Sequence, residues 1–311
     1  MRYSVIVPCY NEEAVIRATQ ERLSAVMDGL NEDYEIIYVN DGSRDATETI
    51  LREIIASDPH VKALMFASNR GHQIAVTAGL DYASGDAVVI IDADLQDPPE
   101  VIPEMIGRWK AGAQVVYGQR RRREGETFFK KFTASAYYRI LARLTGGMVP
   151  RDTGDFRLVD KAVVQAIRRM PEHDRFLRGM FAWVGFRQEA VLYDRDKRFA
   201  GETHYPLKKM LQLAANGLFS FSLTPLRFVT ALGVFWTALG ALALLAVLVV
   251  LLCGASVGLW ALAAFGALLA GNVILCAGLI GEYIGRIYNE ARQRPLYFIS
   301  DMPGFDINIQ N

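Results

Sequence analysis

Residues 86–100 read DAVVIIDADLQDPPE and join a strongly apolar run to a cluster of carboxylates. The run Val88 to Ile91 is rich in β-branched residues, which is typical of a strand buried on both faces of a sheet. Asp92, Asp94 and Asp97 follow directly. Like charges crowded at the end of a buried strand repel one another unless a cation lies among them. The stretch therefore predicts a strand that ends at a site for a divalent metal ion and a diphosphate.

Similar strand patterns alternate with helical patterns through the first half of the chain. Strands are predicted at 4–8, 35–39, 61–66, 87–91 and 115–118, and helices at about 12–30, 45–57 and 72–83. Residues 150–160 read as a loop that leads to another strand or helix. This alternation predicts an α/β fold, a parallel sheet with helices on both faces. Ligands of such sheets bind beyond the carboxyl ends of the strands.

The chain changes character after its first two thirds. Residues 228–281 contain no Asp, Glu, Lys or Arg, which predicts two membrane-spanning helices at about 228–252 and 258–281. Basic residues flank both outer ends and are absent from the connecting turn, so the ends are predicted to be cytoplasmic. The predicted organisation is a catalytic domain at 1–205, an interfacial amphipathic region at 206–226, the transmembrane hairpin at 227–285 and a cytoplasmic tail at 286–311.

Composition narrows the function. The formal net charge is zero, which argues against a nucleic-acid-binding protein. Three cysteines without metal-type spacing favour a reducing compartment. The N-terminal segment MRYSVIVPCYNEE reads as a first strand and not as a signal peptide. His60, His72 and His173 have no metal-ligand spacing and are interpreted as structural.

The carboxylate cluster has two readings from its residues alone. Asp92 and Asp94 are two apart, so on a strand they share a face, and Gln96 adds a further oxygen ligand for a metal. Asp97, followed by two prolines, also fits a turn and a helix start.

A second candidate set follows the first two strands. Asp41 is placed to accept a hydrogen bond from a nucleobase or ribose, Pro8 and Tyr10 to shape a base pocket, and Glu12 to reach the ribose. The alternative for Asn-Asp-Gly-Ser at 40–43 is an ordinary turn.

Several segments together resemble a known family: VIVPCYNEE, VNDGSRDAT, SNRGHQIAVTAGLDYASGD, DADLQDPPE, TGDFRLVD, FAGETHY and GEYIGRIYNEARQRPLY. They are similar to the polyprenyl-phosphate glycosyltransferases of glycosyltransferase family 2, which have the Rossmann-like GT-A fold. The kin include dolichyl-phosphate mannose synthases, bactoprenol glucosyltransferases of O-antigen modification and aminoarabinose transferases. NDGSRDATE, RWKAGAQVV and GDFRL look most like the bactoprenol glucosyltransferase branch.

The resemblance implies roles for individual residues. It implies that Asp92, Ala93, Asp94 and Gln96 bind the nucleotide diphosphate, with Mg²⁺ or Mn²⁺ held by the three polar members. It further implies that the lipid phosphate of the acceptor is held by Arg120, Lys131 and Ser135. Lys131 and Ser135 are four apart and so share one face of a helix. Arg121 to Arg123 have a second reading, a solvated patch that attracts anionic lipid.

Two further roles carry alternatives. Arg198 matches an arginine that contacts the donor diphosphate, but His204 stands where the family commonly has lysine, so the role of His204 is open. Asp155 has two readings, a contact to a sugar hydroxyl or a structural residue. Together with Asp92, Asp94 and Arg120, it completes the predicted catalytic set.

The implied reaction is an inverting transfer of a sugar, glucose from UDP-glucose, to undecaprenyl phosphate at the cytoplasmic face of a bacterial inner membrane. GDP-mannose and a UDP-aminoarabinose compound are alternative donors. The resemblance also implies a homo-oligomer, a tetramer in the family. A processive polysaccharide synthase is a weaker reading because the chain has no Gln-x-x-Arg-Trp motif. A non-catalytic scaffold is weaker because Asp94 and Arg120 are present.

Overall fold

The computed structural model describes residues 2–121, 153–196, 224–254 and 258–305. They fall into two compact units. The first comprises Met1–Ala214 together with Pro295–Asn311, and the second comprises Ala215–Arg294.

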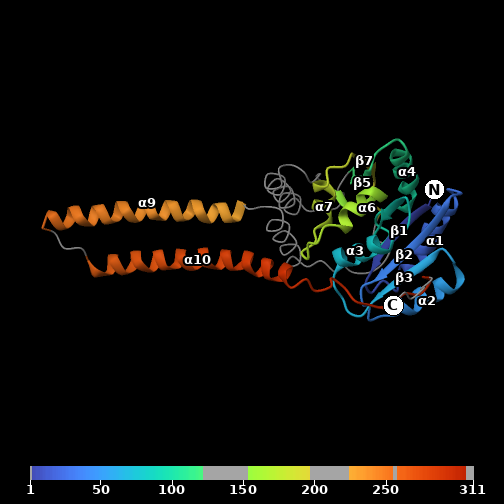
Figure 1. The fold of residues 1–311 in the computed structure, drawn as a ribbon, viewed down its shortest axis with the longest axis horizontal. Helices are drawn as coiled ribbons and strands as arrows, with labels where there is room; N and C mark the ends of the chain where they lie inside the picture. The colour runs from blue at the N-terminus through green and yellow to red at the C-terminus, as the bar shows by residue number, and fades with distance from the viewer. Residues whose placement is uncertain (1, 122–152, 197–223, 255–257, 306–311) are drawn as a thin grey trace. The chain divides into compact units, whose positions relative to one another are not determined.

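The first unit is built on one mixed sheet (Figure 1). Its strands in the described residues are β1 (Arg2–Cys9), β2 (Asp33–Asn40), β3 (Val61–Phe66), β4 (Ala87–Ile90), β5 (Val115–Arg120), β6 (Thr153–Asp160), β7 (Gln188–Tyr193) and β8 (Ile299–Asp301). They are arranged in the order β7-β5-β6-β4-β1-β2-β3-β8. The predicted strands at the start of the chain are confirmed.

The predicted parallel sheet is confirmed for β1 to β4, but the sheet as a whole is mixed. β6 runs antiparallel to both β4 and β5, and β8 runs antiparallel to β3. Residues 150–160, which the sequence suggested as a loop, contribute most of their length to β6. Phe156, Leu158 and Val159 are fully buried. A strand buried on both faces looks the same in either direction, because its apolar pattern carries no polarity.

Helices cover both faces of the sheet, as predicted. On one face lie α1 (Ile16–Asp28), α2 (Thr47–Ser57) and α4 (Ile102–Lys110), which follows the short 3₁₀ turn η1 (Pro99–Val101). Their apolar sides form one core with alternate strand residues, among them Val5, Ile36 and Val89. On the other face lie α3 (His72–Tyr82), α6 (Lys161–Arg168) and α7 (Leu177–Trp183). α3 packs so closely on β1 that a Cβ on Gly79 would lie 2.3 Å from Ile6.

The residues after the second unit return to the sheet. The Tyr297 ring stacks on Phe66 with centroids 5.1 Å apart, and its hydroxyl donates to Asp81 at 2.8 Å. The Ala63 N–H donates to the Pro303 carbonyl at 2.9 Å. The segment predicted only as a tail therefore extends the sheet through β8, which has just three residues and gives no periodic signal.

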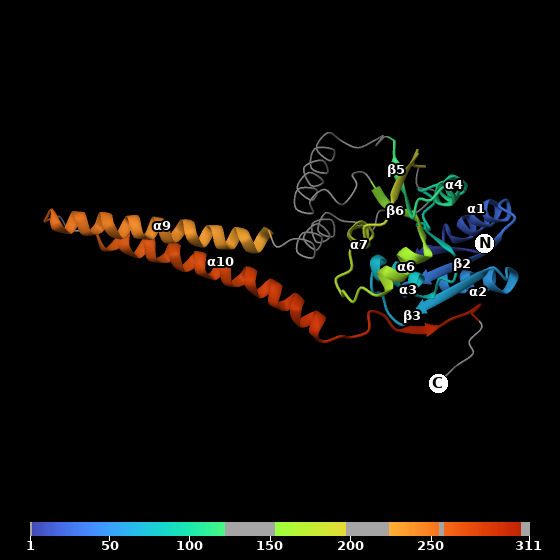
Figure 2. The same cartoon turned by 45° about the horizontal axis from the view of Figure 1, so that its top comes forward.

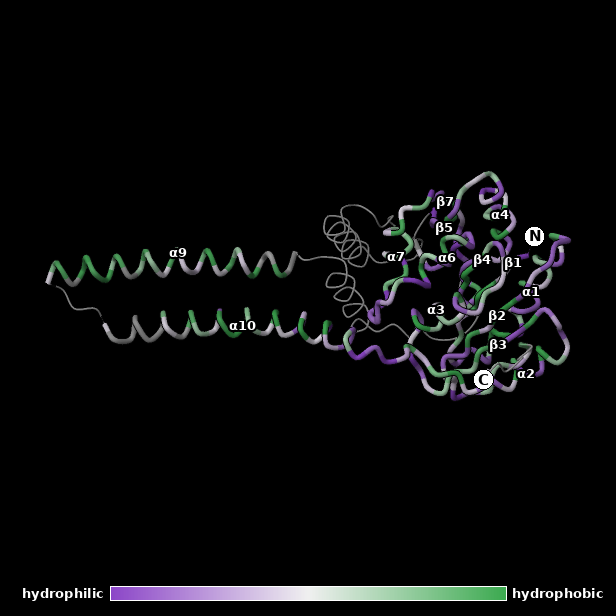
Figure 3. The backbone as a smooth tube through the Cα atoms, in the orientation of Figure 1, coloured by the Kyte–Doolittle hydropathy of each residue, from purple (hydrophilic) through white to green (hydrophobic). Residues whose placement is uncertain are grey.

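The second unit contains two long apolar helices, α9 (Thr224–Leu252) and α10 (Leu259–Ala291). They run side by side in both views (Figures 1 and 2) and are apolar along most of their length (Figure 3). By length and composition, Val229–Val250 and Leu268–Ala291 are able to cross a membrane. α10 continues well past the predicted end at 281, because the polar residues beyond Gly281 still form good helix. The predicted interfacial region at 206–226 lies outside the described residues up to 223.

Candidate active site

The predicted site residues that the structure describes lie at one edge of the sheet. β1, β2, β4 and β5 end at this edge, and β6 begins there because it runs antiparallel to β4 and β5. The edge therefore collects the predicted residues that the structure describes: Pro8, Tyr10, Glu12, Asp41, Asp92, Ala93, Asp94, Gln96, Arg120 and Asp155. The remaining four predicted residues, Lys131, Ser135, Arg198 and His204, lie outside the described residues.

The loops after β1 and β2 brace each other. The backbone of Asn11 is in the left-handed region, at φ 57°, and its N–H donates to Ser43 Oγ at 2.9 Å. The Arg44 N–H donates back to Asn11 Oδ1 at 2.8 Å, and the Glu12 N–H donates to Thr47 Oγ1 at 2.8 Å. These bonds hold the predicted nucleoside-binding loops in a fixed shape before any ligand binds.

Asp41 is buried beneath these loops. Its two carboxylate oxygens accept the backbone N–H groups of Arg70, at 2.6 Å, and Gly71, at 2.8 Å. Burial raises the pKa of Asp41, and the two backbone bonds oppose that rise. The carboxylate thus fixes the turn that starts α3. A contact to the nucleoside would have to use its remaining lone pairs, and that role stays a prediction.

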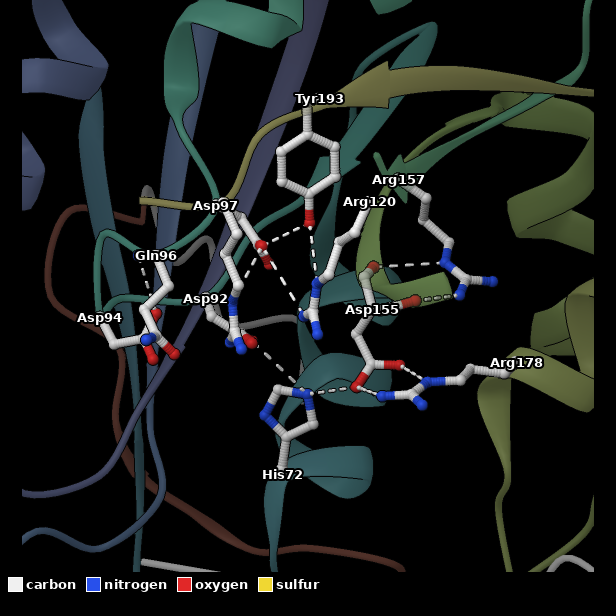
Figure 4. Close-up of polar contacts among 12 residues, drawn as sticks. His72, Asp92, Asp94, Gln96, Asp97, Arg120, Asp155, Arg157, Arg178 and Tyr193 are labelled. Carbon is white, nitrogen blue, oxygen red and sulfur yellow. Dashed lines mark hydrogen bonds and ion pairs between the residues drawn. The ribbon is translucent and has the colours of Figure 1, made fainter. Parts of the chain in front are cut away.

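The loop after β4 is strained and firmly anchored. Leu95 is buried yet has φ 57°, a conformation that costs of order 1 kcal/mol and is concentrated at functional sites. The Gln96 N–H donates to Asp94 Oδ1 at 3.1 Å. The Ala93 carbonyl accepts from Thr19 Oγ1 at 2.7 Å. The strained turn brings Asp94 and Gln96 together, as Figure 4 shows.

A row of alternating charges crosses the site (Figure 4). His72 Nε2 lies 3.7 Å from Asp92 Oδ1 and 3.2 Å from Asp155 Oδ2. Arg178 clamps Asp155 from the other side, with Nε 2.7 Å from Oδ1 and Nη2 3.1 Å from Oδ2. The Leu177 N–H donates to Gln73 Oε1 at 2.9 Å, which ties the start of α7 to the start of α3. The two cations are therefore placed by adjacent helices.

These contacts shift the pKa values of Asp92, His72 and Asp155. Burial raises the pKa of Asp92 to about 6, although its side chain keeps 34 % of its exposure and His72 opposes the rise. Burial opposes the charge on His72, but Asp92 and Asp155 together raise its pKa to about 9. Burial also disfavours ionised Asp155, yet Arg178 and His72 hold its pKa well below the usual range. At neutral pH the row carries two carboxylates and two cations.

A second charged cluster lies beside this row. Asp97 is 1 % exposed, and it accepts a short hydrogen bond from the Tyr193 hydroxyl. Arg120 Nη2 and Arg195 Nε each lie 3.8 Å from Asp97 Oδ1. Burial raises the pKa of Asp97, against the opposing effects of Tyr193 and the two arginines.

Arg157 supports the start of β6 from within the core. It is 4 % exposed, and its guanidinium donates to the Gly154 carbonyl at 2.9 Å and the Asp155 carbonyl at 3.2 Å. It also stacks on Phe181 at 4.6 Å from the ring centroid. The backbone that carries Asp155 is thus fixed by a residue that lies below the site.

The donor set at this edge suits a hard divalent cation. Asp92 and Asp94 supply carboxylate oxygens, and Asp92 is crowded by Asp94, Asp97 and Asp155, whose charges raise its pKa further. No group of three or more His, Cys, Asp or Glu residues in the described part of the chain forms a complete metal site. One or two carboxylates are what proteins usually provide to Mg²⁺, with substrate phosphates completing the coordination.

Sequence reasoning did not identify several members of the two clusters. His72 was interpreted as structural, and Arg178, Tyr193 and Arg195 were not singled out. Two signals for His72 were present. It lies in the segment SNRGHQIAVTAGLDYASGD, and it follows β3, which ends at the same edge of the sheet.

Comparison with known proteins gives consistent results along the chain. Residues 4–168 match the model described as Glycosyl transferase family 2. The uncharacterized glycosyltransferase YkcC of Bacillus subtilis is 51 % identical, over 98 % of this chain and 95 % of its own length. The bactoprenol glucosyl transferase of Shigella phage SfV is 39 % identical, over 97 % of this chain and 99 % of its own length.

A solved structure supports the fold. The glucosyl-3-phosphoglycerate synthase of Mycobacterium tuberculosis, in complex with Mn²⁺, UDP and phosphoglyceric acid, is 22 % identical with a TM-score of 0.51. The match covers 70 % of this chain and 76 % of that one. At this identity the likeness shows a shared fold alone.

Proposed function

Because the chain belongs to glycosyl transferase family 2, has a GT-A-like fold and is a glycosyltransferase, we propose that it transfers glucose from UDP-glucose to a polyprenyl phosphate. The products are a polyprenyl-phosphate glucose and UDP. The observation that carries the proposal is full-length similarity to bactoprenol glucosyl transferases, combined with charged clusters at the one sheet edge where ligands of α/β folds bind.

The donor side of the proposed reaction uses the loop after β4. Asp94 and Gln96, with Asp92 beside them, would hold a divalent cation such as Mg²⁺ or Mn²⁺. When bound, that ion would neutralise charge on the diphosphate leaving group. The braced loops that carry Tyr10 and Glu12 would hold the nucleoside. Asp155, fixed by Arg178 and His72, is left with little capacity to accept further bonds. We therefore favour a positioning role for it over direct contact with the sugar.

The acceptor side uses Arg120, with Lys131 and Ser135 as its proposed partners. A phosphate monoester has its second pKa near 6, so at neutral pH the acceptor oxygen is already anionic and needs no general base. The difficulty is repulsion between the acceptor phosphate and the donor diphosphate. Positive charge from Arg120 at the end of β5 reduces this repulsion at the acceptor.

The two long helices support a reaction at a membrane. We propose that α9 and α10 both span the bilayer, with their outer ends and the first unit in the cytoplasm. Helices of this length and composition support the proposal, as do the basic residues that flank the hairpin. Anchoring the enzyme where the lipid phosphate lies raises the effective concentration of the acceptor.

A comparison of three sugar donors, each assayed separately, tests the proposed function. The full chain is reconstituted in vesicles that contain undecaprenyl phosphate, with Mg²⁺ or Mn²⁺ and one labelled donor: UDP-glucose, GDP-mannose or a UDP-aminoarabinose compound. The proposal predicts that label from UDP-glucose enters the lipid fraction, and only when polyprenyl phosphate is present. Preferred incorporation from another donor would overturn the choice of glucose, and absence of lipid label from all three would overturn the acceptor.

A further inference from the structure

We propose that Tyr193 and Asp97 are positioning residues for Arg120, and that they set the affinity for the phosphate of the acceptor lipid without affecting the donor. This inference rests on the proposed function, because Arg120 is the arginine assigned to the acceptor. Tyr193 and Asp97 come from separate elements, the last residue of β7 and the loop after β4.

The contacts form a closed triangle (Figure 4). The Tyr193 hydroxyl donates to Asp97 Oδ1, Arg120 Nε lies 3.5 Å from the Tyr193 oxygen, and Arg120 Nη2 lies 3.8 Å from Asp97 Oδ1. Asp97 and Tyr193 are 1 % and 3 % exposed, whereas the Arg120 side chain keeps 22 % of its exposure. The two buried side chains, Asp97 and Tyr193, thus hold the guanidinium of Arg120, whose side chain is partly exposed.

The 3.5 Å and 3.8 Å distances define what the triangle does. Both distances are longer than the 2.7–2.9 Å of a strong charge-assisted hydrogen bond, so neither contact fully uses the hydrogen-bonding capacity of the guanidinium. The arrangement therefore orients Arg120 while leaving most of its donors for an anion.

Gly154 supplies the space that this orientation requires. A Cβ at that position would lie 3.2 Å from Arg120 Nη2 and 3.9 Å from Asp97 Oδ2. The contact is tighter than nine in ten real Cβ contacts, so the guanidinium would have to shift by a few tenths of an ångström to admit a methyl group. The glycine at the start of β6 thus lies directly against the Arg120 guanidinium.

Asp97 also links the two halves of the site. It lies three residues after Asp94 in the same strained loop, and the Asp196 N–H, just beyond Tyr193, donates to the Gln96 carbonyl at 2.9 Å. The loop that carries the donor-side carboxylates is thereby fixed to the arginine proposed for the acceptor. That link is a backbone bond and does not involve the Tyr193 hydroxyl.

The test is Tyr193→Phe, which removes the hydroxyl but keeps the ring that packs edge-on against Phe156. We expect the KM for polyprenyl phosphate to rise about tenfold, while the KM for UDP-glucose and the Kd for UDP stay within twofold. Tyr34→Phe is the matched control, since the Tyr34 hydroxyl also donates to an aspartate, Asp28, at 2.6 Å, near the opposite edge of the sheet. It should change none of the three constants.

A double-mutant cycle shows whether Tyr193 acts through Arg120. If it does, adding Tyr193→Phe to Arg120→Lys has little further effect on the acceptor KM. Gly154→Ala should raise the same KM by displacing the guanidinium.

Two results would overturn the inference: an unchanged acceptor KM in Tyr193→Phe, or equal rises in donor and acceptor KM. Wild-type transfer in the same assay separates this outcome from failure of the proposed function. If the wild type glucosylates no polyprenyl phosphate, the function itself is wrong.

Discussion

Two carboxylates at opposite edges of one sheet, the buried Glu35 and the partly exposed Asp92, have pKa values shifted in opposite directions. Glu35 lies near the start of β2 and is 1 % exposed, yet hydrogen bonds from Lys62, Ser4 and Ser84 outweigh burial and lower its pKa to about 2. Asp92 follows β4 at the other edge, and burial raises its pKa to about 6. The ionised carboxylate is fully stabilised by hydrogen bonds at Glu35 and is not fully stabilised at Asp92.

The difference lies in the number of partners. Within the described part of the chain, the Glu35 carboxylate accepts five hydrogen bonds. Two come from the Oγ atoms of Ser4 and Ser84, both at 2.6 Å, and one from the Ser84 N–H at 2.9 Å. The other two come from Lys62 at 2.8 Å and Arg2 at 3.0 Å. A buried carboxylate whose oxygens all accept hydrogen bonds within the protein contributes to stability and has little capacity left for a ligand. Among the residues that the structure describes, Asp92 has one ion-pair partner, at 3.7 Å, and three carboxylates around it. A carboxylate that lacks compensation in the free protein is suited to a ligand that brings positive charge.

We expect the largest loss of activity from a substitution in the donor-side loop after β4. Asp94→Ala should lower glucosyl transfer by about a thousandfold or more, because several kcal/mol of charge stabilisation at the leaving group are lost. The melting temperature should stay within about 2 °C of wild type, as expected for a partly exposed side chain. Initial rates at equal folded protein give the result, with Asp33→Ala on the remote edge as control. Normal turnover in Asp94→Ala would remove this residue from the site.

The second effect is on stability alone. Glu35→Gln leaves Lys62 and Arg2 facing an uncharged amide and should cost about 3 kcal/mol, which lowers the melting temperature by roughly 6–12 °C for a unit of this size. Activity per folded molecule should not change. Thermal unfolding and kinetics on the same preparation separate the two quantities. A variant that melts normally but transfers slowly would reverse the roles assigned to the two edges.

A smaller effect is expected at the clamp on Asp155. Arg178→Lys replaces a two-point contact with a single charge, which should lower kcat/KM for the donor about tenfold. Arg168→Lys is the matched control, because within the described residues the Arg168 guanidinium donates to the backbone carbonyls of Leu80 and Ala83 and to no carboxylate. If both variants lose activity equally, the Arg178 contact has no specific role in the reaction.

The smallest effect is a pH dependence of stability. The folded-state pKa of Glu35 is lowered, from an ordinary 4.5 to about 2. Its contribution is therefore complete above pH 4.5 and is lost as pH falls toward 2. By pH 3.5 about 1 kcal/mol should be gone. The gap in melting temperature between wild type and Glu35→Gln should narrow accordingly from pH 7 to pH 3.5. A gap that widens on acidification would contradict the assigned sign.

Local patterns predicted much of this molecule. The strands from β1 to β5 and helices α1 to α3 were visible because their apolar residues are periodic. The carboxylates of DADLQD were visible because they follow such a strand directly. β8 was not visible, since three residues carry no period, and the direction of β6 was not visible because both of its faces are buried.

The missed site residues have a common cause. Tyr193 lies in no quoted motif, and His72 lies in the quoted segment SNRGHQIAVTAGLDYASGD but was given no role there. Their contacts to Asp97 and Asp155 span large separations in sequence. Such pairs arise when loops and strand ends meet at one edge of a sheet, which depends on strand order. Strand order was not predicted, so neither cluster could be assembled from the sequence.

The central claim is that a lipid phosphate attacks the sugar itself, and product stoichiometry tests it most directly. The reconstituted enzyme is given UDP-glucose and undecaprenyl phosphate, and the lipid product is identified by mass spectrometry while released nucleotide is quantified. The account predicts one UDP for each lipid that gains a single hexose and keeps one phosphate. Release of UMP with a lipid diphosphate sugar, or release of UDP without any glycosylated lipid, would contradict it.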